Sequence, residues 1–179
     1  MGTIKQPLPV KLVLPMISGQ RELFQIAAET LAQRFGAIDY TSPVLSFTHT
    51  NYYEEEFGNG LLRQFVSFHP LMDPGKLAEV KVFANGLEDQ WSADGRRRIN
   101  LDPGYITQAK LVLATTKNHA HRVYIGQGIF AEVTLMYRDG DFRFLPWTYP
   151  DYQSEPYLEI LRTIRGMFVA QLKEWQAGT

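Results

Sequence analysis

The chain has 179 residues, of which 45% are hydrophobic and 21% charged, with a formal net charge of −1 and no cysteine. This length and composition are typical of one globular domain with a core of its own, so we expect a single domain over residues 1–179 and exclude a disordered chain. The lack of cysteine excludes disulfides, a cysteine nucleophile and thiolate metal sites, and the small net charge gives no general signal for nucleic acid.

The sequence shows no sign of membrane insertion. No stretch reaches the ~18 consecutive apolar residues that a transmembrane helix needs. The N-terminus lacks the long apolar run of a signal peptide and is broken by Pro7, Pro9 and Pro15. We therefore expect a cytoplasmic protein.

The first elements are a short apolar run and an amphipathic stretch. Residues 10–16 (VKLVLPM) are bounded by prolines and predict a buried strand. Residues 20–35 predict a helix, which Ser18 could cap and Gly36 could end in a left-handed turn. The apolar face of this helix is formed by Leu23, Ala27, Leu31 and Phe35.

The next elements are a broken extended stretch, a strand and a second helix. Residues 37–47 are expected to be extended, with an interruption at Pro43, and residues 61–69 predict a strand that is apolar on both faces. Asp73 followed by Pro74 is typical of a helix start. The apolar face of that helix is formed by Leu77, Val80, Phe83, Leu87 and Trp91.

The segment after this helix allows two interpretations. Residues 98–101 predict a short strand, and the Asp102–Pro103–Gly104 sequence could repeat the Asp-Pro helix start. We favour a helix over residues 103–115, because the segment is long for a strand. The alternative is a turn followed by a strand in KLVLATT.

The last third of the chain is rich in strand signals. Residues 122–125 and 129–137 predict strands, and Asp139–Gly140 predicts a tight hairpin to a partner strand over residues 142–147. Ser154 begins a final helix, whose buried face is formed by Tyr157, Leu161, Ile164, Phe168, Leu172 and Trp175.

Taken in chain order, these elements predict an α+β fold. We expect a mixed, largely antiparallel sheet with a ferredoxin-like βαββαβ portion, a C-terminal β-hairpin region and a packed C-terminal helix.

Well-known catalytic and nucleotide-binding motifs are missing from the sequence. It contains no GxxxxGK[ST], no GxGxxG after the first strand, no HExxH and no GxSxG. P-loop, Rossmann, zinc-protease and α/β-hydrolase sites are therefore not indicated.

His119 and His121 form an HxH pair in the segment TTKNHAHR, flanked by Lys117 and Arg122. On a strand the two imidazoles would face the same way and could contact one anionic ligand, while the flanking cations could bind phosphate or carboxylate. The alternative, which we favour for the segment itself, is a solvated loop between two elements.

The same histidines allow a metal site, which we do not favour. His119 and His121 would supply two nitrogen ligands, and a third would have to come from Glu132, Asp102 or His49. Zinc suits such a nitrogen and oxygen set, but the spacing supports only the first two ligands.

Glu132 lies on a largely apolar face of a predicted strand. A carboxylate there needs a partner, and Arg122 or a histidine of the preceding segment is the obvious one. A structural salt bridge and a catalytic acid or base are equally supported. His119 and His121 are the other candidates for catalysis.

Three further residues could face a ligand. Tyr53, beside the acidic run at 54–56, and Tyr105, after the Asp-Pro-Gly turn, could provide aromatic walls. His49 follows a predicted extended segment and could also contact the ligand.

The strings NLDPGYIT, LVLATTKNHAHRVYIGQGIFAEVTL and FLPWTYPDY resemble the bacterial DUF4416 family, a domain of unknown function, and the resemblance covers essentially the full chain. It implies a stand-alone domain of about this length, with no established activity and no established catalytic residues to carry over. Names that mention GTP binding are attached to some such proteins, but the sequence has neither a P-loop nor an NKxD motif.

We therefore expect a protein that binds or turns over a small anionic ligand, nucleotide-like or phosphorylated, because basic residues 117–122 lie close to Glu132 in the chain. Whether it is an enzyme, and with which cofactor, stays open. The alternative is a non-enzymatic interaction or self-associating domain. Its mark would be a flat apolar patch, for which Trp147, Tyr149 and Tyr152 are candidates.

Overall fold

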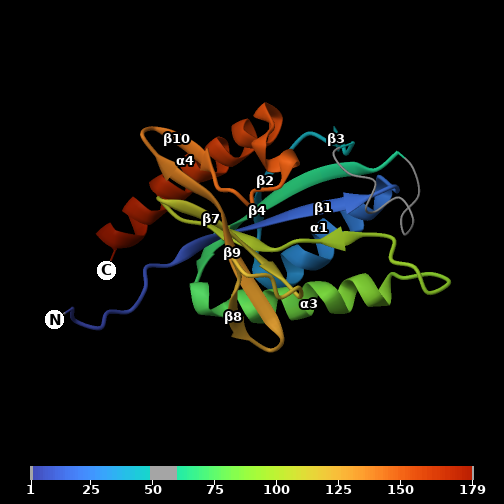
Figure 1. Ribbon diagram of the computed structural model, residues 1–179, viewed down its shortest axis with the longest axis horizontal. Coiled ribbons are helices and arrows are strands. Elements are labelled where there is room, and N and C mark those ends of the chain that lie inside the picture. Colours follow the sequence, from blue (N-terminus) through green and yellow to red (C-terminus); the bar gives the residue numbers. More distant parts are fainter. Residues whose placement is uncertain (1, 49–59, 179) are drawn as a thin grey trace.

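The computed structural model describes residues 2–48 and 60–178, which form one antiparallel sheet covered by helices on both faces. Helix α4 (Glu155–Ala177) lies on one face, and α1 (Glu22–Phe35) and α3 (Leu77–Gln90) lie on the other (Figure 1). The expected α+β fold is confirmed.

The described part of the chain contributes ten strands to this sheet. They are β1 (Val10–Ser18), β2 (Ile38–Thr41), β3 (Leu45–Ser46), β4 (Leu62–Met72), β5 (Asn100–Leu101), β6 (Gly104–Ile106), β7 (Lys110–Thr115), β8 (Val123–Gly126), β9 (Ile129–Arg138) and β10 (Asp141–Phe144). The main path runs β10–β9–β7–β6–β1–β4–β2, while β3 pairs with β4, β5 with β1, and β8 with β9.

The ferredoxin-like portion is the part from β1 to β6. Its strands lie in the order β2–β4–β1–β6, its pairings are antiparallel, and its two helices α1 and α3 pack on the same face. The C-terminal half extends the sheet beyond β6 through β7, β9 and β10. The structure therefore contains the βαββαβ unit and the following hairpin region that the pattern of strands and helices predicted.

The centre of the sheet is buried on both faces, because each face has its own hydrophobic core. In β1, Leu12, Leu14 and Met16 pack with α1 and α3, whereas Val13 packs on the other side with Phe65 and α4. Strands covered on both faces are continuously apolar rather than alternating. This explains the unbroken apolar run that predicted β1.

The one lysine in this central strand is bonded within the fold. The Lys11 ammonium, which is fully buried, donates to the Gln171 side-chain oxygen at 2.8 Å and to the Phe68 carbonyl at 3.0 Å, and it pairs with Asp39. Because Gln171 belongs to α4, this cluster ties the helix to the sheet. A buried charge is tolerated when it is paired and hydrogen-bonded in this way.

The prediction of a helix over residues 103–115 is wrong. The segment forms β6 and β7, joined by a tight turn, which is the alternative interpretation. Leu111 and Leu113 pack toward α4, while Val112 and Ala114 pack toward α3. A strand buried on both faces has no period of two, so its apolar run can imitate the spacing of a helix.

Most other expected boundaries agree with the structure. Asp73 accepts a hydrogen bond from the Gly75 amide at 2.8 Å and begins a 3₁₀ turn, η1 (Pro74–Lys76), that leads into α3. Asp139 and Gly140 both have positive φ in the predicted hairpin. The expected buried face of α4 is correct except at Trp175, which is 43% exposed.

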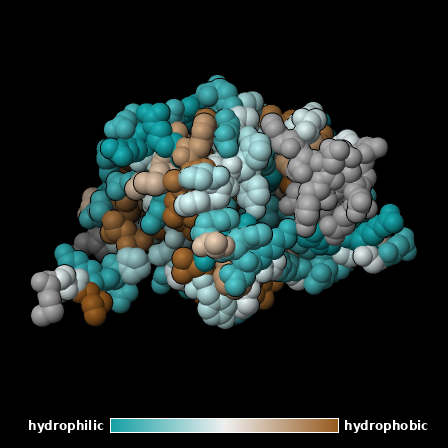
Figure 2. All heavy atoms as spheres, viewed as in Figure 1, coloured by the Kyte–Doolittle hydropathy of each residue, from teal (hydrophilic) through white to brown (hydrophobic). Residues whose placement is uncertain are grey.

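The described helices are each too short or too polar to cross a membrane. Figure 2 shows that hydrophilic residues dominate the visible face and that hydrophobic residues occur there in small, separate groups. Among the described residues, this face therefore has no broad apolar patch.

Candidate functional site

A cavity of about 950 Å³ lies beside the beginning of β4 and the end of β5. Its walls come from α3, from the β7–β8 loop at residues 116–122, and from the segment at 145–153 that precedes α4 and contains the 3₁₀ turn η2 (Pro150–Gln153). Segments distant in sequence therefore meet around one concave space, which is where small-molecule sites are usually found.

Strand register places three polar residues on one side of the sheet. Ile17 of β1 pairs with Arg63 of β4 on one side and with Asn100 of β5 on the other. Residues directly opposite in antiparallel strands share a face, and so do alternate residues along a strand. Arg63, Asn100 and Asp102 consequently point the same way, toward the cavity that all three line.

Arg63 is among the most buried cations of this cavity, with a side chain that is 3% exposed. Its Nη2 donates to Asp151 at 2.9 Å and its Nε donates to the Tyr157 hydroxyl at 3.2 Å. Aromatic rings surround the guanidinium, those of Phe47, Phe65, Tyr152 and Tyr157, with centroids 5.1–5.8 Å from its carbon. Rings and carboxylate together hold this charge in a fixed orientation.

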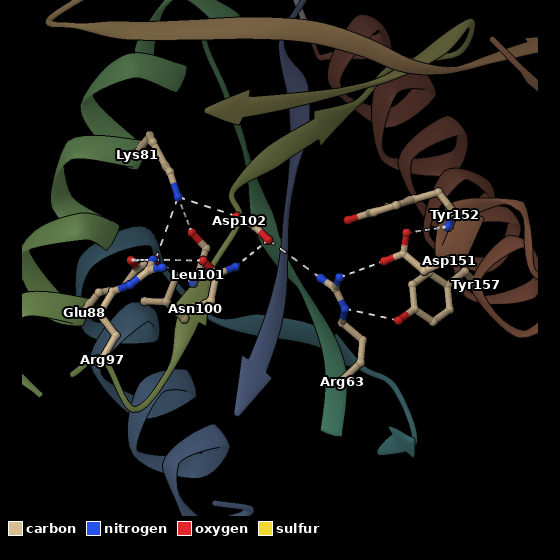
Figure 3. A network of polar contacts seen from close by, with 10 residues as sticks. All are labelled: Arg63, Lys81, Glu88, Arg97, Asn100, Leu101, Asp102, Asp151, Tyr152 and Tyr157. Carbon is tan, nitrogen blue, oxygen red and sulfur yellow. Dashed lines mark hydrogen bonds and ion pairs between the residues drawn. The ribbon is translucent and has the colours of Figure 1, made fainter. Parts of the chain in front are cut away.

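Two buried polar atoms beside the cavity have no hydrogen-bond partner among the described residues. They are Nη1 of Arg63 and the hydroxyl oxygen of Tyr152. Nη1 lies 3.8 Å from Asp102, which is close enough for an ion pair but too long for a hydrogen bond. In Figure 3 the Tyr152 hydroxyl points toward the space between Asp102 and Arg63.

A second charged group lies on the opposite side of Asp102 (Figure 3). Lys81 of α3 donates to the Leu101 carbonyl at 2.7 Å and lies 3.8 Å from Glu88 and 3.6 Å from Asp102. Glu88, two helical turns further along the same side of α3, accepts from the Leu101 amide at 2.6 Å and from Arg97 at 2.9 Å. Burial raises the pKa of Glu88, although Lys81, the Leu101 amide and Arg97 all favour its carboxylate form.

Glu132 anchors the loop at residues 116–122. Its carboxylate accepts from Arg122 Nε at 2.8 Å, contacts His121 Nε2 at 3.0 Å and accepts from the Thr134 hydroxyl at 3.3 Å. Arg122 also donates to the Lys117 carbonyl at 3.0 Å and to the Tyr149 hydroxyl at 2.7 Å. The buried carboxylate thus has the partners that its position in the sequence requires, and they fix the loop over the cavity.

The two histidines lie in a turn, not on a strand. The rings of His119 and His121 stack at 6.0 Å, and His121 stacks on Trp147 at 5.2 Å with an interplanar angle of 13°. Rings that stack in this way do not converge on a common point. Among the described residues there is no group of three or more histidine, aspartate or glutamate side chains placed to hold a metal ion.

The structure brings together most of the residues that the sequence singled out. Six of them line the cavity: Asp102, Lys117, His119, His121, Arg122 and Glu132. Tyr105 lies elsewhere, packed beside the cluster that contains Leu77 and Val112. His49 and Tyr53 lie outside the described residues.

The aromatic segment before α4 does not form a flat three-ring patch. Tyr152 is 2% exposed, so it belongs to the core and to the cavity wall. Trp147 and Tyr149 are 36% and 45% exposed, and both line the cavity. The prediction of an interaction surface built from all three rings is therefore wrong.

Sequence reasoning missed the inner wall of the cavity, formed by Arg63, Lys81, Glu88, Asn100 and Asp151. One signal was available for two of these residues. Lys81 and Glu88 are seven residues apart, two helical turns, and flank Ala84 on the buried side of α3. Charges on the apolar face of a helix indicate a buried polar cluster.

A family model described as "Domain of unknown function (DUF4416)" matches residues 8–168, nearly the whole chain. The chain belongs to the DUF4416 family. The matched range contains every cavity residue named above. The searches of curated proteins and of solved structures found no match.

Proposed function

We propose that this DUF4416 protein binds a small anionic ligand in the cavity, with Arg63 and Tyr152 as the groups that contact the anion. The observation that carries this proposal is the pair of buried polar atoms, Arg63 Nη1 and the Tyr152 hydroxyl, without a partner among the described residues. A buried polar group without a partner costs roughly 1–3 kcal/mol. An anion that reached these two atoms from the cavity would supply an acceptor to both.

Both groups are hydrogen-bond donors at neutral pH. The guanidinium of arginine stays protonated in proteins. Burial raises the pKa of the Tyr152 hydroxyl well above its ordinary value, so the phenol keeps its proton. A charged donor and a neutral donor that point into the same space suit an anionic oxygen better than a cation.

The residues of the loop would have a different role. Lys117 and His119 line the cavity and could contact a ligand that enters past the loop. Arg122 and Glu132 are bonded to each other, and Arg122 also bonds to neighbouring residues, so in this proposal they position the loop. We assign no catalytic role to any of these side chains.

The Tyr152→Phe variant tests the proposal, with acetate and inorganic phosphate as probes. Binding to the folded state raises its stability by RT ln(1 + [L]/Kd), which is about 1.4 kcal/mol at ten times Kd. Thermal unfolding of the parent protein should therefore shift upward as the probe concentration rises. In Tyr152→Phe the affinity should fall about tenfold or more, since a hydrogen bond to a charged group contributes roughly 1.5–3 kcal/mol.

Tyr137→Phe is the matched control. Its hydroxyl donates to the Gly140 carbonyl at 2.7 Å in the terminal hairpin, and Tyr137 does not line the cavity. Salts such as phosphate stabilise most proteins without binding a specific site, and that general effect must be equal in both variants. If Tyr152→Phe responds to the anions as the parent protein does, the proposed site is wrong.

A further inference from the structure

The charges around the cavity limit the kind of anion that it can hold. Its lining contains five cationic residues, which are Arg63, Lys81, Arg97, Lys117 and Arg122. It also contains five carboxylates, which are Glu88, Asp89, Asp102, Glu132 and Asp151. The formal charge of the wall, with neutral histidines, is therefore zero.

Three of these cations already have carboxylate partners within the wall. Arg63 pairs with Asp151 at 2.9 Å, Arg97 with Glu88 at 2.9 Å, and Arg122 with Glu132 at 2.8 Å. A ligand with several negative charges would bring them into a space without matching positive charge, at a high electrostatic cost. A single negative charge, placed on Arg63 Nη1 and the Tyr152 hydroxyl, fits this wall better.

The position of Asp102 further requires that the ligand have a hydrogen-bond donor beside its negative charge. Its carboxylate is 26% exposed, lies 3.8 Å from Arg63 Nη1 and 3.6 Å from Lys81, and accepts a hydrogen bond from Asn100 at 2.6 Å. Two carboxylate oxygens offer about four acceptor positions, so Asp102 can accept more. The atoms next to an anionic group bound at Arg63 would therefore lie close to Asp102. The Asp102 carboxylate would repel a negative charge there and would attract a hydroxyl or ammonium group.

We propose that the ligand carries a single anionic group with a hydroxyl or ammonium group next to it, as 2-hydroxy- and 2-amino-carboxylates do. The carboxylate would accept from Arg63 and Tyr152, and the adjacent group would donate to Asp102. This inference rests on the proposed anion site and adds the chemical class of its ligand. The cavity, at about 950 Å³, leaves room for a larger body attached to this head group.

Ligand-observed saturation-transfer NMR with head-group probes tests the inference. The probes are propionate, DL-lactate, DL-alanine and inorganic pyrophosphate, which differ in the neighbouring donor and in charge. Lactate and alanine should bind about tenfold more tightly than propionate, because each adds a hydrogen bond to a charged acceptor. Pyrophosphate should bind no more tightly than propionate.

The Asp102→Asn variant should remove this preference. Alanine should lose about tenfold in affinity, while propionate should bind as well as before or better, because the negative charge beside it is gone. Asp89→Asn is the matched control, since it removes the same charge from the same cavity without contacting Arg63, and it should keep the preference for alanine. Asp102→Ser replaces Asp102→Asn if the latter unfolds at the temperature of the measurement.

The outcomes separate the inference from the proposed site. Equal affinities for propionate, lactate and alanine, all weakened by Tyr152→Phe, would overturn the ligand class and leave the anion site standing. If pyrophosphate bound more tightly than the other probes, the ligand class would likewise be overturned and the anion site would stand. Failure of every probe to bind, or binding that Tyr152→Phe does not change, would overturn the site and the ligand class together.

Discussion

Among the described glycines, Gly104 is the one at which an added methyl group should disturb the sheet most. It begins β6 and pairs with Val13 of β1 on one side and with Leu113 of β7 on the other. A Cβ at this position would lie 2.3 Å from the Val112 carbonyl oxygen and 2.6 Å from a Leu113 methyl carbon. The nearer atom is backbone, so the overlap cannot be relieved by a change of rotamer.

The size of the effect follows from this overlap. An ordinary contact begins at 3.4 Å, so β6 and β7 would have to separate by about 1 Å in the middle of the sheet. Overpacking of this kind costs typically about 1–3 kcal/mol, and occasionally more. For a chain of this length each kcal/mol lowers Tm by roughly 2–4 °C, so Gly104→Ala should lower Tm by roughly 2–12 °C.

Gly86→Ala is the control for this prediction, because it makes the same chemical change in an open position. Gly86 lies inside α3, and its added Cβ would have no neighbour within 4 Å among the atoms of the structure. Alanine is favoured over glycine in a helix by about 0.5–1 kcal/mol, so this variant should be more stable than the parent. Thermal and urea unfolding followed by circular dichroism measure both changes. Equal Tm values for Gly104→Ala and the parent protein would refute the packing that places β6 against β7.

Two further predictions concern charged pairs. Arg162 donates two hydrogen bonds to Asp141 and lowers the pKa of that carboxyl from 3.8 to about 2. The stability that this pair contributes should therefore be present above pH 4 or so and be lost as the pH falls through about 2. Carboxyl-carbon NMR should show that titration midpoint, and Arg162→Gln should raise it toward 3.8, although the Phe142 amide still favours the carboxylate; an unchanged midpoint would contradict the pairing. Separately, Arg122→Met leaves the buried carboxylate of Glu132 without its main partner and should cost about 3–5 kcal/mol, of which the double variant with Glu132→Leu should recover a large part. Urea unfolding of the single and double variants decides this, and equal losses in the two would show that the charge of Glu132 is not the cause.

The fold was largely predictable because most elements have one apolar face. The helix α1 and the hairpin at Asp139–Gly140 each follow from one local rule. The residues of β7 do not, because Leu111 and Val112 are both buried, on opposite faces of the sheet. Periodicity cannot separate such a strand from a buried helix, and the deciding contacts with α3 and α4 come from distant parts of the chain.

The outer part of the cavity was predictable, and the inner part was not. The basic segment around His121 and the carboxylate of Glu132 are close in sequence, so their cluster is visible without a structure. Arg63 and Asp151 are 88 residues apart and meet only because β4 and η2 lie side by side. A single arginine within an apolar strand gives no indication of its partner, so local patterns could not reveal this pair.

The most direct test of the anion site is to observe the side chain of Arg63 while an anion binds. In protein with ¹⁵N-labelled arginine, the Nε and Nη signals of Arg63 should be resolved, because the group is buried and bonded to Asp151 and Tyr157. We predict that DL-lactate moves these signals along a saturable curve, and that the shift is lost in Tyr152→Phe. A titration that leaves the Arg63 signals in place, while those of exposed arginines move, would contradict the anion site at Arg63.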